Sequence, residues 1–175
     1  MNEIELVAHA KQDPQAFGAL YELHFERVFR FVYHRLNEKQ TAKDITQQVF
    51  VKALLNIHSF QFKGFTFSSW LFRIAINELN RFYGQIKKER CVNIDSEGLK
   101  EILMEVNETA YAALDQALFS ALKHLTDDQL LIVEMRYFEK RSFAEIGEIM
   151  GITENNAKVR LYRVIDKLKV LMKTN

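Results

Sequence analysis

Aromatic rings and polar side chains that could bind nucleic acid are concentrated in residues 60–83. This segment, FQFKGFTFSSWLFRIAINELNRFY, holds eight aromatic residues in 24 positions, against about three expected from the chain-wide aromatic content of 12%. Rings stack on unpaired bases, cations bind phosphates, and amides read base edges. The segment therefore predicts a surface for opened, single-stranded nucleic acid. The competing interpretation is that the rings fill a hydrophobic core.

Four polar residues of this segment recur at the i, i+4, i+7 and i+8 positions of a helix, which places them on one face. They are Arg73, Asn77, Asn80 and Arg81. The helix that carries them is expected to begin near Ser68 or Ser69 and to continue toward residue 88. Trp70 and Phe72 are predicted to belong to the core rather than to contact bases.

A second candidate site lies in residues 142–169, which have the pattern of a helix-turn-helix. Ser142 with Glu145 predicts a capped helix start, small Gly147 allows two helices to approach closely, and Gly151 predicts the turn. The second helix presents a polar, basic face that fits the major groove of DNA. Its candidate DNA contacts are Thr153, Asn155, Asn156, Lys158, Arg160 and Arg163, followed by Lys167. The alternative is an amphipathic hairpin with a solvated basic face.

The elements that position these residues are predicted to be helices throughout. The chain has one proline and six glycines, and apolar residues recur at spacings of three and four. Asp13-Pro14 is expected to open a helix that runs to about residue 36, with His24 as a core residue. Thr41 with Asp44 is expected to start the next helix. Residues 110–124 should form another helix, and Thr126 with Gln129 should cap one that runs to about residue 138.

Charge is segregated along the chain. Residues 1–90 hold 13 Lys/Arg and 9 Asp/Glu, residues 91–125 hold 2 and 6, and residues 155–175 hold 6 basic residues and one acid. Basic regions separated by an acidic span are typical of two nucleic-acid contacts. The prediction is an all-α protein of two small helical domains, residues 1–90 and 109–175, joined by an acidic linker over residues 91–108. A short helix around residues 99–106 is one interpretation of part of that linker.

Several function classes find no support in the residues. The five histidines do not fall at metal-ligand spacing, Cys91 is the only cysteine, and no glycine-rich phosphate loop occurs. The sequence therefore predicts no enzyme, no metal and no cofactor. The absence of a signal peptide, of an internal disulfide and of a long apolar run predicts a cytoplasmic protein without membrane insertion.

Four segments together resemble bacterial RNA polymerase sigma factors of the extracytoplasmic-function (ECF) type. They are DPQAF at 13–17 with LY at 20–21, AKDITQQVF at 42–50, FSSWLFRIAIN at 67–77, and LT at 125–126 with RYF at 136–138 and FAEIG at 143–147. The third segment is the most specific. The resemblance covers nearly the whole chain and implies a protein that binds core polymerase and directs it to promoters.

The resemblance implies a role for each candidate surface. The first domain would read and melt the minus-ten element, with Phe62, Lys63, Phe65 and Thr66 in a base-capturing loop beside the helix face of Arg73, Asn77, Asn80 and Arg81. The second domain would read the minus-thirty-five element. Asp44, Gln47, Gln48 and Lys52 would dock on the clamp helices of the large polymerase subunit. An anti-sigma protein is an expected regulator.

Two other functions remain open from the residues alone. A stand-alone helix-turn-helix regulator would use residues 1–90 as a sensor or dimer domain and would bind duplex DNA tightly without polymerase. A nucleic-acid enzyme would need a clustered acidic or metal site, whereas Asp44, Glu78 and Asp115 are scattered along the sequence.

Overall fold

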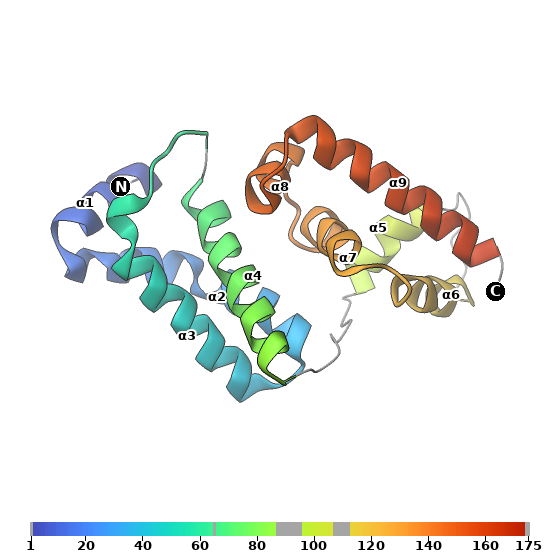
Figure 1. Ribbon diagram of the computed structural model, residues 1–175, viewed down its shortest axis with the longest axis horizontal. Helices are drawn as coiled ribbons and strands as arrows, with labels where there is room; N and C mark the ends of the chain where they lie inside the picture. The colour runs from blue at the N-terminus through green and yellow to red at the C-terminus, as the bar shows by residue number, and fades with distance from the viewer. Residues whose placement is uncertain (1, 65, 87–95, 107–112, 174–175) are drawn as a thin grey trace. The chain divides into compact units, whose positions relative to one another are not determined.

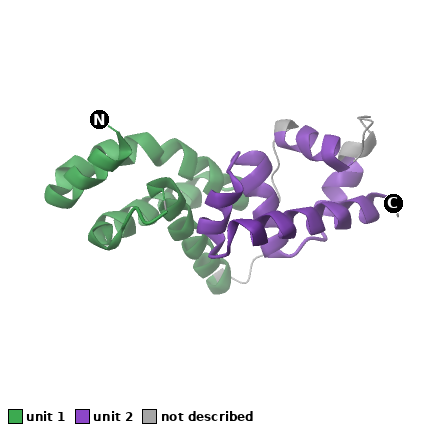
Figure 2. Cartoon of the chain, turned by 90° about the horizontal axis from the view of Figure 1, so that it is seen from above, with its two compact units in different colours: residues 1–91 green, residues 92–175 purple. Residues whose placement is uncertain are grey.

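The structure, a computed structural model, describes residues 2–64, 66–86, 96–106 and 113–173. These ranges form helices joined by short connections and contain no β-strand (Figure 1). The chain divides into two compact units, residues 1–91 and residues 92–175 (Figure 2). The prediction of an all-α protein with two helical domains is confirmed.

Three long helices build the first unit: α2 (Phe17–Leu36), α3 (Lys39–Leu55) and α4 (Phe67–Ile86). Each of the three packs against the other two (Figure 1). Their facing stripes bury aliphatic and aromatic side chains in one core, including Leu20, Val32, Val49, Phe67 and Leu79. Because these apolar residues recur every three or four positions, burying them leaves the opposite face of each helix in solvent.

Local capping decides where α2 and α3 begin. The Asp13 carboxylate accepts a hydrogen bond from the Gln15 N–H at 2.9 Å, and a 3₁₀ turn η1 (Pro14–Ala16) leads into α2, as predicted. Helix α3 begins at Lys39. The Glu38 carboxylate caps it by accepting hydrogen bonds from the N–H groups of Gln40 and Thr41. The expected start at Thr41 is therefore wrong by about half a turn.

An additional helix, α1 (Glu3–Gln12), precedes these three and was not expected from the sequence. Asn2 and Glu5 form a reciprocal capping box, with hydrogen bonds of 2.9 and 2.8 Å. The helix buries only Val7 and Ala10, so its apolar periodicity is weak. Near its end, Lys11 Nζ donates to the Phe60 carbonyl at 2.6 Å and thereby fixes the connection that leads to α4.

The second unit contains α5 (Ser96–Val106), α6 (Ala113–Leu122), α7 (Asp127–Val133), the π-helical turn η3 (Glu134–Phe138), α8 (Phe143–Met150) and α9 (Glu154–Lys173). Both capping boxes predicted here are confirmed: Thr126 with Gln129 at α7, and Ser142 with Glu145 at α8. Helix α9 packs on α5, α6, α7 and α8. Its Ala157, Leu161, Val164, Ile165 and Leu168 are all buried.

A tight turn joins α8 to α9 and explains two glycines. Gly151 adopts the left-handed conformation with φ of 69°, which favours glycine because it has no Cβ. The Ile152 N–H donates back to the Gly147 carbonyl at 2.9 Å. A Cβ at Gly147 would lie 2.7 Å from the Ile152 carbonyl oxygen, too close for a side chain. The helix-turn-helix prediction is confirmed by this geometry.

The span predicted as a linker, residues 91–108, includes a packed helix. Helix α5 buries Ile102 and Leu103 and contacts α6, η3 and α9. The Tyr137 hydroxyl donates to the Glu105 carboxylate, and the Lys140 ammonium pairs with Glu101 at 2.5 Å. The described part of this span is therefore an element of the second unit, because its apolar face finds a core there.

Candidate nucleic-acid interface

Helix α4 presents an exposed polar row opposite its buried stripe. The side chains of Arg73, Asn77, Asn80 and Arg81 are all exposed. The opposite face is buried and consists of Phe67, Leu71, Phe72, Ala75 and Leu79. The amphipathic pattern of the sequence therefore produces the predicted row on one side of a helix anchored by the other.

Among its described residues, the loop before α4 carries a partly exposed ring, Phe62, and an exposed cation, Lys63. Phe62 is 37% exposed, whereas Phe60 is 3% exposed and contacts the Phe62 ring edge-on at 4.8 Å between centroids. Lys63 is exposed, and Gly64 allows the chain to turn with φ of 77°. Phe60 is thus the anchor of the loop, and Phe62 and Lys63 remain accessible to a ligand.

The other two loop candidates differ from this pair. Thr66 Oγ1 accepts from the Ser69 N–H at 3.0 Å and donates to Ser69 Oγ at 2.8 Å, so its hydroxyl caps α4. Its side chain is partly buried. Phe65 lies outside the described residues. The loop therefore contributes Phe62 and Lys63 to the accessible surface, while Thr66 holds the start of the helix.

Buried rings fasten the loop to α4. Trp70, which is half-buried, lies 5.1 Å from Phe60 and 5.5 Å from Phe67 between ring centroids. Phe72 is fully buried and contacts Phe31 of α2 at 5.0 Å. The prediction that Trp70 and Phe72 serve the core is confirmed for Phe72, and Trp70 lies at the edge of that core.

Helix α3 exposes most of the residues expected to meet polymerase. Asp44, Gln47 and Gln48 are exposed, and Asp44 accepts from the Gln40 side-chain amide at 3.1 Å. Lys52 is partly buried, and its ammonium pairs with the Glu78 carboxylate of α4. The first three therefore form an accessible face, and Lys52 borders it.

A polar network missed by the sequence analysis links α3 to α4. Glu78 is only 5% exposed and pairs with Lys52 and, at 2.8 Å, with Arg81 Nη2. Arg81 Nη2 also donates to Gln48 Oε1 at 3.2 Å. An acid three residues before an arginine on a helix is a sequence signal for such a pair, but it does not reveal the partners on α3.

Helix α9 presents the second polar surface. Thr153 Oγ1 accepts from the Asn156 N–H at 3.2 Å and caps the helix as predicted. The candidates Asn155, Asn156, Lys158, Arg160 and Arg163 are all exposed. Lys167 instead donates to the His124 carbonyl at 3.2 Å and to the Gln129 side chain at 2.9 Å. The accessible surface therefore occupies the first half of α9, and Lys167 contributes to the packing of the unit.

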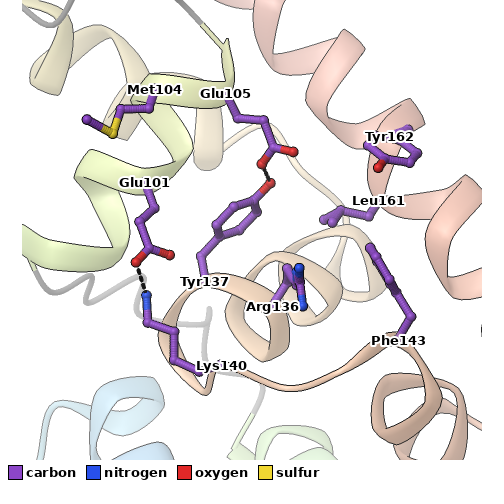
Figure 3. Close-up of a pocket in the computed structure, with 9 residues that line it drawn as sticks. All are labelled: Glu101, Met104, Glu105, Arg136, Tyr137, Lys140, Phe143, Leu161 and Tyr162. Carbon is purple, nitrogen blue, oxygen red and sulfur yellow. Dashed lines mark hydrogen bonds and ion pairs between the residues drawn. The ribbon is translucent and has the colours of Figure 1, made fainter.

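A pocket of about 530 Å³ opens between α5, η3 and the helix-turn-helix (Figure 3). Tyr137 points across it to Glu105, and the Arg136 guanidinium lies over the Phe143 ring at 4.8 Å. Burial, together with this carboxylate, raises the pKa of the Tyr137 phenol above its ordinary value. The Tyr137–Glu105 hydrogen bond therefore fastens α5 to η3, and the Lys140–Glu101 ion pair fastens α5 to the connection that follows η3.

The start of α8 holds a second charged contact. The Arg141 guanidinium, almost fully buried, pairs with Glu145 Oε1 at 2.7 Å. Burial opposes ionisation of Glu145, but hydrogen bonds from the Ser142 N–H and from Arg141 outweigh it and lower the carboxyl pKa. The cap of the helix-turn-helix and the Arg141 contact therefore favour the ionised form of Glu145.

Neither a cluster of metal ligands nor a membrane-spanning helix is found among the described residues. No group of three or more His, Cys, Asp or Glu residues there could hold a metal ion. Among the same residues, no helix is long and apolar enough to span a bilayer.

Two family models match the chain, one for each unit. The model of Sigma-70 region 2 matches residues 20–89, which include α2, α3 and α4. The model of Sigma-70, region 4 matches residues 121–170, which include the helix-turn-helix.

Individual proteins show the same similarity. The ECF RNA polymerase sigma factor BldN of Streptomyces coelicolor is 30% identical over 177 residues, which cover 97% of this chain and 65% of BldN. The ECF RNA polymerase sigma factor SigW of Bacillus subtilis is 26% identical over 169 residues, which cover 91% of this chain and 90% of SigW.

A solved structure shares the fold. The sigma factor RpoE of Bartonella quintana, in complex with the anti-sigma factor NepR, aligns with a TM-score of 0.60 and 20% identity over 91% of this chain and 98% of that chain. The family models, the relatives and the observed helices agree along the sequence. The chain belongs to the bacterial RNA polymerase sigma factors of the ECF type.

Proposed function

We propose that this protein is a sigma factor that binds core RNA polymerase and directs promoter recognition, promoter melting and transcription initiation. The strongest support is the exposed row of two arginines and two asparagines on α4, beside the accessible Phe62 ring. A cationic row with amides and a ring suits a strand whose bases are unpaired. The proposed role is regulatory and requires no catalytic residue in this chain.

The first unit would hold the opened minus-ten strand. Arg73 and Arg81 would contact phosphates, and Asn77 and Asn80 would contact base edges. Phe62 would stack on a base that has left the duplex, recovering about 1–3 kcal/mol of the unstacking cost. Lys63 and Phe65 belong to the same proposed loop, in which Thr66 acts by capping α4.

The polymerase contact would lie on α3. Asp44, Gln47 and Gln48 form the exposed face proposed to dock on the clamp helices of the large polymerase subunit, and Lys52 borders it. This face and the α4 row belong to the same packed unit, so polymerase binding would place the row at the promoter.

The second unit would read the minus-thirty-five element with the first half of α9. Asn155, Asn156, Lys158, Arg160 and Arg163 would enter or border the major groove, where each good bidentate base contact discriminates by about 1–3 kcal/mol. Thr153 would fix the N-terminus of that helix. We propose residues 1–90 and 109–175 as the two functional domains. Residues 91–108 lie between them in the sequence, and α5 of that span packs into the second unit.

An anti-sigma protein is the proposed regulator. The RpoE structure contains such a partner, the anti-sigma factor NepR. We extend this kind of partner, but not its identity, to the present chain. The proposed place of action is the cytoplasm, where polymerase and promoters are found.

The test combines binding with transcription. The purified full chain is expected to be retained by immobilised core polymerase and to create new start sites when the holoenzyme transcribes fragmented genomic DNA. Gln47→Ala is expected to weaken core retention without changing duplex binding by the free chain. A chain that neither binds core nor changes start sites would contradict the proposal, and tight duplex binding without polymerase would favour a stand-alone regulator.

A further inference from the structure

Glu78 places a nearly buried carboxylate between the helix proposed to meet polymerase and the row proposed to meet DNA. Its side chain is 5% exposed, whereas those of Lys52 and Arg81 are 40% and 55% exposed. Arg81 Nη2 lies 2.8 Å from Glu78 Oε2 and donates across the helix interface to Gln48 Oε1 at 3.2 Å. Arg81 Nη2 is therefore held by Glu78 of α4 and by Gln48 of α3.

Because both Lys52 and Arg81 pair with Glu78, one of the two cations can leave the carboxylate while the other stays. A buried carboxylate that loses its partner is strongly destabilising, because its charge is then neither hydrated nor paired. Lys52 stays in contact with Glu78 when Arg81 leaves, so departure of Arg81 does not leave that carboxylate unpaired. Arg81 is also the more exposed of the two cations and can reach a ligand in solvent.

A DNA phosphate and Glu78 compete for the same guanidinium. While Arg81 is paired, the Glu78 charge offsets the attraction of Arg81 for a phosphate. Gln48 strengthens this hold from the α3 side, and Gln48 is exposed on the proposed polymerase face. A polymerase group that binds the Gln48 amide would remove one of the two anchors of Arg81.

We propose that Glu78 and Gln48 withhold Arg81 from the DNA strand in the free protein, and that polymerase binding at Gln48 makes Arg81 available. Glu78 is thus a positioning residue that acts through Arg81. The inference rests on the proposed function, because it takes α3 as the polymerase face and α4 as the strand face. It predicts that one substitution at a buried acid increases DNA binding by the free chain.

The first measurement uses the full chain and a fluorescein-labelled, mixed-sequence single-stranded oligonucleotide in a salt series. Glu78→Gln keeps the volume of the side chain but frees Arg81. Because Arg81 is 55% exposed, solvent screens the pair, and binding is expected to tighten about two- to fivefold. The slope of log affinity against log salt is expected to steepen by about 0.7, the value for one additional phosphate contact to a single strand. Gln48→Ala removes the other, exposed anchor and is expected to tighten binding in the same direction.

Two controls separate Arg81 from net charge. Glu26→Gln makes the same charge change at an exposed position of α2 and is expected to leave the affinity and the slope unchanged. Adding Arg81→Ala to Glu78→Gln is expected to abolish the gain. The second measurement repeats the titration with holoenzyme, where the ratio of Glu78→Gln to wild-type affinity is expected to return toward one.

Retention of each variant on core polymerase distinguishes the two proposals. Equal affinities and slopes for wild type, Glu78→Gln and Gln48→Ala, with normal core binding by the wild type and by Glu78→Gln, would overturn this inference alone. A gain that persists in the Arg81→Ala background would also overturn it, because the gain would then come from charge at position 78. A wild-type chain that fails to bind core would overturn the proposed function and this inference together.

Discussion

Replacing Arg160 and Arg163 with alanine is expected to weaken promoter binding and to make it less sensitive to salt. Both side chains are exposed in the first half of α9, three residues apart and so on neighbouring positions of one helix face. Arg160 Nε also donates to Asn156 Oδ1 at 3.0 Å, which orients its guanidinium. Because both positions are exposed, the double substitution is expected to leave the fold intact, since surface substitutions usually alter stability by less than about 0.5 kcal/mol.

The size of the effect follows from the two charges removed. Each phosphate contact on duplex DNA contributes about 0.9 to the slope of log affinity against log salt, so losing two should reduce the slope by about 1.8. Between 50 and 200 mM salt, the wild type should therefore lose about tenfold more affinity than the double variant.

The assay is a titration of holoenzyme on a duplex promoter fragment across that salt range. Lys169→Ala with Lys173→Ala is the matched control, because it removes the same charge from the other end of α9. Along the helix, Lys169 and Lys173 lie about 9 and 15 Å from Arg163 and about 14 and 20 Å from Arg160, separations near or beyond the Debye length of about 10 Å at 0.1 M salt. An unchanged slope in the arginine variant, or an equal change in the lysine variant, would refute the assignment of these arginines to the DNA contact.

Three further results are expected. Asn77→Ala should impair promoter opening while sparing core binding, because the exposed amide is proposed to contact the opened strand and not polymerase. Permanganate footprinting checks this, with exposed Gln85→Ala of α4 as the control. Phe72→Ala should destabilise the first unit by about 3–5 kcal/mol in urea unfolding, because the ring is fully buried, and Phe72→Leu should cost less. The lowered pKa of Glu145 stabilises the fold above its ordinary pKa of 4.5, and this stability is lost as the pH falls through the lower folded pKa. Glu145→Gln should therefore reduce the loss of unfolding free energy in that acidic range. An unchanged loss would contradict the proposed effect of the Arg141 and Ser142 contacts on Glu145.

Much of the fold was predictable because its signals are local. The capping boxes of Thr126 with Gln129 and Ser142 with Glu145 each involve residues one turn apart, and both form as expected. The turn at Gly151 likewise depends on the conformation of a single residue. Helix α1 was not predicted, because its local apolar pattern is weak. Its two buried residues depend on packing against α2, which the sequence does not reveal.

The candidate site was predictable where it depends on the face of one helix. The spacing of Arg73, Asn77, Asn80 and Arg81 places them on one side, and the structure exposes all four. The loop was less predictable, because alternate rings have different partners. Phe60 is buried against Phe67 and Trp70, while Phe62, two residues later, remains partly exposed.

By itself, the sequence determined the helical class, the caps of α7, α8 and α9, the helix-turn-helix and the polar rows, since each of these follows from residues within one or two turns of one another. The tertiary structure alone decided that Lys52 and Gln48 of α3 share Glu78 and Arg81 with α4, and that α5 packs into the second unit. These contacts join residues 26 and 33 positions apart in the network of the first unit. Helical periodicity specifies which face of a helix is polar, but the partner of that face depends on how the helices pack.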